Sequence, residues 1–405
     1  MSKGRFIVIV LDSFGVGAMD DVSKVRPQDL GSNTAKHLIE SPEVKIWPTL
    51  EKLGLMNILN FEYDDLKMSP VAIFGRSELK HFGADSYFGH QEIAGTNPFV
   101  PIYTYIQIHL DDIEEDLIKH GYEVHRIYRH DLAVLKVDNQ IIVGDNMETD
   151  LGQAINVVGA LDDCGFDKIE AVGRIVRKHV KVARVIAFGG SGVTIKDLED
   201  NIIYKEHFIG VDAPGSGVYK NNYHVDHMGY GVDAKLQVPT AIHEKGVKNY
   251  FYGKVENIIL NPEGKNYAAV DSEDILDHLI EDVKVIDEGF FFVNIQETDL
   301  AGHAEDSARY IDVLNKCDVK ISELLEIVAP QDVVIVMADH GNDPTIGHSK
   351  HTREEVPLLI YRKDNTKLID IGKQNTMANV GQTVADYFNT KIEYGTSFLS
   401  QINPK

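Results

Sequence analysis

Aspartate and histidine residues gather at the ends of apolar, strand-like runs in this sequence. They are Asp12, then Asp299 and His303, then Asp339, His340 and Asp343, and finally His348 and His351. Taken singly, an aspartate after a strand is usually a turn residue or a helix cap, and a lone histidine is usually structural. In α/β sheets, however, ligands collect at the carboxyl ends of the strands. Because several strand ends carry such residues, the sequence predicts that they form one site.

These side chains suit divalent metal ions. Aspartate and histidine without cysteine favour borderline ions such as Mn²⁺ or Zn²⁺. Two such ions can bracket a phosphoryl group and neutralise its oxygens. The chain has 40 basic and 63 acidic residues, a net charge of −23. This charge argues against a nucleic-acid or membrane-surface partner, whereas a small anionic substrate remains compatible if bound ions supply positive charge.

A serine in a glycine-rich segment is the candidate nucleophile. Ser86 lies in the stretch 83–92, after a predicted strand at 71–77. A loop serine is usually a cap or turn residue. Beside a metal ion, however, its hydroxyl becomes a nucleophile.

The elements that position these residues are predicted from apolar periodicity. Continuous apolar runs at 6–11, 289–295, 332–338 and 356–361 are typical of buried strands, and apolar stripes at 275–283 and 310–325 indicate helices. Strands alternating with helices predict a doubly wound α/β fold. The middle differs, with short strands predicted at 103–109, 123–128, 133–137 and 141–143 and helices at 151–161 and 169–180. We therefore expect a core formed by 1–97 and 226–405, and an inserted α+β domain at 98–225.

Cysteine usage and the start of the chain bear on location. Cys164 and Cys317 are too few for a disulfide framework or a zinc knuckle, and we expect them to be reduced. The apolar run at 6–11 is too short for a signal peptide, and no run is long enough to span a membrane. The sequence therefore predicts a cytoplasmic protein.

Four sequence motifs resemble the alkaline phosphatase superfamily in its phosphomutase branch, and phosphopentomutases in particular. They are the opening Val10-Leu11-Asp12-Ser13-Phe14-Gly15-Val16-Gly17-Ala18, Asp85-Ser86-Tyr87-Phe88-Gly89-His90-Gln91-Glu92, Ala338-Asp339-His340-Gly341-Asn342-Asp343 and His351-Thr352-Arg353-Glu354. The resemblance covers both ends of the chain. It implies an alkaline-phosphatase-like core that binds two metal ions and carries an inserted cap domain.

The resemblance also implies roles for individual residues. Asp12, Asp339 and His340 would hold one ion, and Asp299, His303 and His351 would hold the other. Ser86 would carry the phosphoryl group, and His90 would orient the segment around it. Lys254 matches a family lysine near the transferred phosphate, with an exposed lysine after a strand as the alternative. The ions are expected to be Mn²⁺, with Zn²⁺ or Mg²⁺ as alternatives.

The sequence departs from the phosphopentomutase pattern in four places. Ser86 replaces the usual threonine, and the spacing from Asp299 to His303 is one residue shorter, as in cofactor-independent phosphoglycerate mutases. The segment 215–226 lacks the family's arginine, and 144–150 aligns only loosely with the residues that hold ribose. These departures affect the prediction of the sugar more than that of the metal chemistry.

The expected activity is phosphoryl transfer within a sugar phosphate of the ribose 1-phosphate/ribose 5-phosphate type, through a phosphoserine. The partners would be a small phosphorylated substrate and a sugar bisphosphate activator. A metal-dependent phosphomonoesterase, or a mutase acting on another phosphorylated metabolite, are the alternatives. A metal sensor without activity is disfavoured, because the chain keeps all six metal ligands and Ser86.

Overall fold

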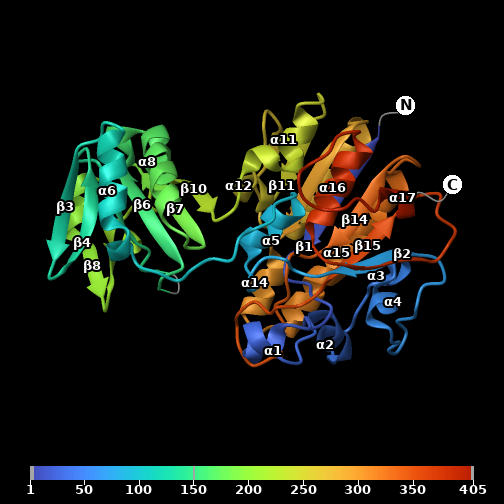
Figure 1. Cartoon of the computed structure of the whole chain (residues 1–405). Helices are drawn as coiled ribbons and strands as arrows, with labels where there is room; N and C mark the ends of the chain where they lie inside the picture. The colour runs from blue at the N-terminus through green and yellow to red at the C-terminus, as the bar shows by residue number, and fades with distance from the viewer. Residues whose placement is uncertain (1–3, 149–150, 403–405) are drawn as a thin grey trace. The chain divides into compact units, whose positions relative to one another are not determined.

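The computed structural model describes residues 4–148 and 151–402, and the chain forms two compact units (Figure 1). The first unit contains the residues up to Pro98 and those from Asp233 onward, and the second contains Phe99–Val232. The expected end of the insertion at residue 225 is too early. Strand β10 (His224–Gly229) pairs with β7 (Arg184–Gly190) and so belongs to the second unit.

The first unit is built on an eight-stranded sheet with the order β12-β11-β13-β1-β14-β15-β2-β16. Its strands are β1 (Arg5–Leu11), β2 (Ile73–Ser77), β11 (Asn249–Tyr252), β12 (Lys265–Tyr267), β13 (Gly289–Ile295), β14 (Val333–Met337), β15 (Val356–Tyr361) and β16 (Ile369–Gln374). Among these strands β15 alone runs antiparallel to its neighbours. The apolar runs of the sequence become the central strands, because both faces of such a sheet are covered.

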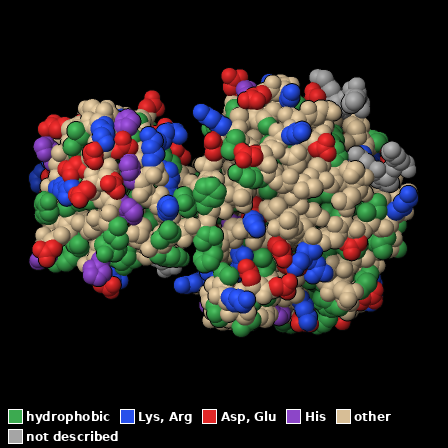
Figure 2. Space-filling view, in the orientation of Figure 1, with side chains coloured by type: hydrophobic (Ala, Val, Ile, Leu, Met, Phe, Trp, Pro, Cys, Tyr) green, Lys and Arg blue, Asp and Glu red, His purple; other side chains and the backbone are tan. Residues whose placement is uncertain are grey.

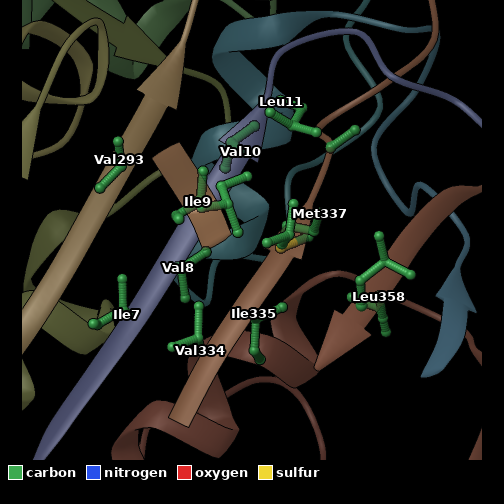
Figure 3. Packing of buried hydrophobic residues seen from close by; sticks show 14 of the residues in the cluster. Ile7, Val8, Ile9, Val10, Leu11, Val293, Val334, Ile335, Met337 and Leu358 are labelled. Atoms are coloured by element: carbon green, nitrogen blue, oxygen red, sulfur yellow. The ribbon is translucent and has the colours of Figure 1, made fainter. Parts of the chain in front are cut away.

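The core of the first unit lies around β1. Every residue of β1 is buried, and Figure 3 shows Ile9 of this strand between Val293 of β13 and Val334 of β14, with Leu358 of β15 beyond β14 in the same apolar cluster. Burying one such aliphatic side chain contributes roughly 1.5–3 kcal/mol. The well-packed central strand therefore fixes the position of Asp12, the residue that follows it.

Helices cover both faces of this sheet, as a doubly wound fold requires. Phe292 points toward His90 of α5 (Ser86–Ile93), whereas Phe291 packs on Tyr252, whose hydroxyl donates to Asp282 of α13 (Ser272–Val285). The remaining helices of the unit are α1 (Val22–Val25), α2 (Thr34–Glu40), α3 (Pro48–Leu53), α4 (Leu55–Leu59), α11 (Val238–His243), α12 (Val255–Ile258), α14 (Glu297–His303), α15 (Ser307–Ile327), α16 (Ala378–Tyr387) and α17 (Leu399–Ile402).

One edge of the sheet collects the predicted chemical groups. The parallel strands β1, β2, β11, β13 and β14 all end there. Because β15 runs the other way, it begins at this edge, and the segment before it, which contains His351, reaches the same place. The antiparallel direction of β15 thus adds a loop that a purely parallel sheet would have sent to the opposite edge.

The second unit contains a six-stranded sheet of order β10-β7-β6-β5-β4-β3 and a hairpin of β8 and β9. Its remaining elements are β3 (Val124–Arg129), β4 (Leu132–Val137), β5 (Ile141–Asp145), β6 (Ala154–Ala160), β8 (Ile202–Lys205), β9 (Phe208–Val211), α6 (Leu110–Lys119), α7 (Leu161–Cys164), α8 (Phe166–His179), α9 (Ile195–Asp200) and α10 (Ala213–Ser216). The expected α+β class is correct. Two elements were wrong: 151–161 contains strand β6, and 103–109 contains a 3₁₀ turn at Ile106–Ile108.

The surface agrees with the mixed composition of the chain. On the face shown in Figure 2, basic side chains lie among acidic and uncharged ones. Across the described residues, no helix is both long enough and apolar enough to cross a membrane.

Candidate metal centre and nucleophile

Asp12 follows the central strand β1 and is completely buried. Its Oδ2 accepts hydrogen bonds from Lys254 Nζ at 3.1 Å and from Asn294 Nδ2 at 3.0 Å. Among the residues that the structure describes, its Oδ1 has no hydrogen-bond partner; it lies 3.5 Å from Nε2 of His340, which also lacks one there. A buried carboxylate oxygen and a buried imidazole nitrogen that face each other unbonded are suited to a shared ligand.

Asp339 and His340 follow β14 and are also fully buried. Oδ1 of Asp339 accepts from the backbone N–H of Ser13 at 3.1 Å, and Oδ2 lies 3.2 Å from His340 Nε2. Asp12, Asp339 and His340 place their ligand atoms within 4.8 Å of one another. They are the three residues expected to hold one ion.

Asp299, His303 and His351 converge beside them. Asp299 lies in α14 after β13, and its two carboxylate oxygens are each 3.3 Å from an Nε2, one of His303 and one of His351. The two Nε2 atoms are 3.0 Å apart. Asp299 and His351 also group with His340, whose ring stacks on that of His351 at 3.9 Å. The six predicted ligands therefore lie together, with His340 between the two sets.

The protonation of the histidines tests whether this donor set fits metal ions. Nδ1 of His303, His340 and His351 faces the backbone carbonyl of Ser349, Gly341 and Ala84, respectively. A carbonyl can only accept, so each Nδ1 carries a proton and Nε2 is the ring nitrogen that faces the cluster, where it can ligate a cation once its own proton is released. Three Nε2 atoms beside three carboxylates form a set of nitrogen and oxygen ligands that fits divalent cations.

The charges of the cluster depend on one another. Burial and the nearby Asp339 carboxylate raise the pKa of Asp12. Burial alone would lower the pKa of His340, but Asp339 outweighs it and raises that pKa to about 10. For Asp299, burial favours a higher pKa, yet His303 and His351 hold the pKa below its ordinary value. The carboxylates therefore need nearby positive charge.

Ser86 begins helix α5 and contacts this cluster. Its Oγ donates to Asp339 Oδ2 at 2.8 Å and accepts from Lys254 Nζ at 2.7 Å. The helix cap is the preceding residue, Asp85, which accepts from the backbone N–H of Phe88. Since Asp85 caps the helix, the hydroxyl of Ser86 is left for other contacts.

Lys254 links Ser86 to Asp12. It follows β11 and Gly253, whose φ of 70° turns the chain back toward the sheet edge. A β-carbon at Gly253 would lie 2.4 Å from the carbonyl oxygen of Asn294, so glycine is required at this close approach. Burial lowers the pKa of Lys254, but Asp12 and the neighbouring carboxylates raise it further, which keeps the ammonium charged.

His90 supports Ser86 from within the same helix. Its Nδ1 donates to the carbonyl of Ser86 at 2.8 Å, and its Nε2 faces Asn294 Oδ1 at 2.7 Å. Because both ring nitrogens face acceptors, the ring is occupied as a donor on both sides. Burial lowers the pKa of His90, but Asp339 outweighs that effect and raises the pKa. This geometry orients the start of α5 and leaves no nitrogen for a metal.

The site also contains two asparagines that were not predicted from the sequence. Asn294 bridges Asp12 and His90, and Asn342 donates to Asp299 Oδ1 at 3.1 Å. The available signal for Asn294 is its place inside a buried apolar strand, where a polar side chain needs a partner.

The segments expected to hold the sugar lie in the second unit. Asp145 is buried, and its two oxygens accept from the backbone N–H groups of Ile106 and Ile209, so it fastens chain segments together. In 215–226, Tyr219 stacks on Phe188 and donates to Glu148. Thr149 and Asp150 lie outside the described residues.

Comparison with known proteins gives the family. The family model of the Metalloenzyme superfamily matches residues 4–392. A phosphopentomutase of Caldanaerobacter subterraneus subsp. tengcongensis is 30% identical over 98% of both chains. One of Acetivibrio thermocellus is 29% identical over 98% of this chain and 99% of its own.

Among solved structures, a phosphoglycerate mutase of Leishmania mexicana is 13% identical, covering 98% of this chain and 97% of that chain with a TM-score of 0.46. The family assignment rests on the two sequence comparisons. The chain belongs to the metalloenzyme superfamily, among its phosphopentomutase-like members, and is a metal-dependent phosphotransferase of the mutase type.

Proposed function

We propose that the protein isomerises a sugar phosphate of the ribose 1-phosphate/ribose 5-phosphate type through a phosphoserine at Ser86. The observation that carries this proposal is the contact of Ser86 Oγ with both Lys254 Nζ and Asp339 Oδ2, beside the cluster of aspartates and histidines. The similarity to curated phosphopentomutases supports the choice of a pentose phosphate.

The hydrogen bonds of Ser86 prepare its oxygen for attack. A hydroxyl has one proton and two lone pairs. The proton points to Asp339 Oδ2, and one lone pair accepts from Lys254 Nζ. The second lone pair is left for phosphorus. The Oγ proton passes to Asp339 Oδ2 as the Oγ–P bond forms and the P–O bond to the sugar oxygen breaks, and the released sugar oxygen takes up a proton. Return of the phosphoryl group to a different sugar oxygen, which gives up its proton, completes the isomerisation.

The residues that would hold the two ions are those of the predicted sets. Asp12, Asp339 and His340 would bind one divalent ion, and Asp299, His303 and His351 the other, with Mn²⁺ as the proposed metal and Zn²⁺ or Mg²⁺ as alternatives. When bound, the ions supply positive charge that neutralises the phosphoryl oxygens. Lys254 adds an ammonium at the attacking oxygen itself, where it stabilises developing negative charge.

The second unit is proposed to act as the cap domain of the enzyme. The chain passes between the units at residues 98/99 and 232/233. Loops at such crossings can serve as hinges. A cap that excludes water would favour return of the phosphoryl group to the sugar over hydrolysis.

Incubation of the Mn²⁺-loaded protein with ribose 1-phosphate, with and without a sugar bisphosphate, tests the proposal. Formation of ribose 5-phosphate is the expected result, together with a phosphorylated Ser86 peptide in mass spectrometry of the quenched reaction. Free phosphate as the main product would instead indicate a phosphomonoesterase. No turnover of either kind would overturn the choice of substrate.

A further inference from the structure

We propose that Arg353 is a positioning residue that fixes the segment 79–85, here called the nucleophile loop, to the segment that contains His351. The proposal rests on the proposed function, because it takes Ser86 as the nucleophile and His351 as a metal ligand. Arg353 belongs to the His351-Thr352-Arg353-Glu354 motif but is not one of the expected metal ligands.

The guanidinium of Arg353 uses all of its donors within the protein. Nε and one terminal nitrogen bind the two oxygens of Asp21 at 2.8 and 2.9 Å. The terminal nitrogens also donate to three backbone carbonyls, those of Leu79 at 3.2 Å, His81 at 2.9 Å and Gly83 at 2.6 Å. Arg353 is only 5% exposed, and its bonds to Leu79 and His81 are buried, whereas Asp21 is partly exposed.

The three carbonyls belong to alternate residues of the nucleophile loop. The next carbonyl, that of Ala84, accepts from His351 Nδ1 at 2.8 Å. Residues 351 and 353 therefore bind four carbonyls along the stretch that leads directly into Ser86. The position of Ser86 relative to His351 is set by these bonds, because they span the short distance between the two segments.

The other side of the loop is held by helix α5. Glu92 accepts from the backbone N–H groups of Lys80 and His81, and from His81 Nδ1 at 2.8 Å. Glu92 lies in the same helix as Ser86, so the loop and the helix form one unit. Arg353 supplies three of the four hydrogen bonds that residues 351 and 353 make to the carbonyls of this unit.

A lysine could not replace this arginine. The planar fork of arginine reaches Asp21 and three carbonyls at fixed angles, whereas an ammonium is a single point with three donors. Loss of the fork frees the nucleophile loop to shift, and a displacement of about 1 Å at a reacting atom can reduce the rate by ~10²-fold.

Arg5 offers a matched control at the opposite edge of the same sheet. It is 7% exposed, and its guanidinium binds Asp332 and the carbonyls of Val283 and Ile286. Arg5 thus has the same kind of partners as Arg353, an aspartate and backbone carbonyls. It lies at the start of β1, away from Ser86.

The test compares Arg353→Lys with Arg5→Lys in the full-length protein. Both variants should lose thermal stability to a similar degree. Arg353→Lys should lower kcat for phosphoryl transfer by ~10²-fold with KM changed less than threefold, whereas Arg5→Lys should keep the wild-type kcat. Hydrogen exchange of the metal-free protein should speed up in peptides covering 79–86 only in Arg353→Lys.

Equal kcat in the two variants, or unchanged exchange at 79–86 in Arg353→Lys, would overturn the proposal. The exchange experiment needs no substrate, so it remains decisive if ribose 1-phosphate proves to be the wrong compound. If Arg353→Lys does not fold, Asp21→Asn takes its place. This variant keeps the three carbonyl contacts, and we expect a loss of kcat near tenfold and faster exchange at the same peptides; wild-type values for both would contradict the proposal.

Discussion

The two edges of the sheet in the first unit differ in how completely their buried carboxylates are paired. At the edge where β1 and β14 begin, Asp332 accepts hydrogen bonds from the backbone and side chain of Arg5 and from the N–H of Ala329. At the edge where the same strands end, Asp12 and Asp339 lie near each other, and Oδ1 of Asp12 has no hydrogen-bond partner in the described part of the chain. Both edges are buried and both are built on the same strands.

This difference in pairing distinguishes charged residues that stabilise the fold from charged residues that are available to bind a ligand. A buried charge that is fully paired costs little, whereas an unpaired one raises the free energy of the folded state. The unpaired carboxylate oxygen of Asp12 therefore lies at the edge where ions and phosphate can satisfy it. The opposite edge supplies stability without taking part in the chemistry.

The largest effect is expected from removing the nucleophile at the functional edge. Ser86→Ala should lower phosphoryl transfer by ~10³-fold or more, because the Oγ that forms the bond to phosphorus is absent. Its melting temperature and metal content should stay close to those of the wild type, since Asp85 supplies the helix cap. Steady-state kinetics, calorimetry and metal analysis on one preparation test this.

Ser86→Thr is the matched variant, because it keeps a hydroxyl and adds one methyl group. It should retain most of the activity. Turnover by Ser86→Ala at the wild-type rate would refute the phosphoserine mechanism and leave the contacts of Lys254 without a catalytic purpose.

The next largest effect is expected at the opposite edge. Asp332→Ala leaves Arg5 buried without its carboxylate, which should cost about 3–5 kcal/mol in the free energy of unfolding. The kcat of the folded variant should be unchanged. Urea unfolding and kinetics measure the two quantities separately.

Asp12→Asn provides the contrast to Asp332→Ala. It removes a carboxylate that faces Asp339, so the metal-free variant should unfold at the same urea concentration as the wild type or a higher one. Its activity should be lost. A strongly destabilised Asp12→Asn would show that the two edges do not differ in the way described above.

A smaller effect should follow from crowding α5 against the β14 loop. A β-carbon at Gly89 would lie 2.9 Å from both Cβ and the carbonyl oxygen of Asp339. Gly89→Ala should therefore cost about 1–3 kcal/mol and push Ser86 away from Asp339, lowering kcat about tenfold or more.

Gly173→Ala in α8 is the control for this substitution. Its new β-carbon would meet mainly the flexible end of Met228, and alanine is the better helix former by about 1 kcal/mol. It should be less destabilising than Gly89→Ala. If Gly89→Ala keeps the wild-type kcat, the packing of α5 on Asp339 does not position Ser86.

Much of the first unit could be predicted from the sequence, because a strand covered on both faces gives a continuous apolar run. The runs at 289–295 and 356–361 became β13 and β15 with those same bounds. Once the strands were located, the residues that follow them could be assigned to one site, because the carboxyl ends of parallel strands meet at one edge of the sheet. The antiparallel direction of β15 could not be predicted, since a buried strand has the same composition in either direction.

The second unit was harder to predict because its pairing is not local. Leu151, Ile155 and Val158 have helical spacing, yet β6 lies between β5 and β7, and its pairing with strands distant in sequence overrides that spacing. Asn294 was missed for a different reason. Its role depends on His90 and Asp12, which are far from it in the chain.

The smallest predicted effect is a change of stability with pH, and it comes from a third kind of buried carboxylate, which lies in the second unit. Asp145 has neither an arginine partner nor a cluster of metal ligands; its described partners are the N–H groups of Ile106 and Ile209. Burial outweighs these two hydrogen bonds and raises the pKa of Asp145 from 3.8 to about 7. Between these values the folded state holds a proton that the unfolded state releases. This group therefore makes the protein less stable as the pH rises from about 4 to about 7.

The slope is about 1.4 kcal/mol for each pH unit, so this group should lower the free energy of unfolding by about 1 kcal/mol between pH 5 and pH 6. Asp145→Asn cannot titrate, and its unfolding should lack this contribution, although it loses one hydrogen-bond acceptor. Urea unfolding of the metal-free proteins, monitored by hydrogen exchange in peptides of β5 and β6, measures how the free energy of unfolding of the wild type and of Asp145→Asn changes with pH. Because all other titrating groups are shared, the difference between the slopes belongs to Asp145. Parallel slopes would mean that two backbone N–H groups are enough to keep a buried carboxylate charged, and that the cations beside Asp12 and Asp332 are not needed for that purpose.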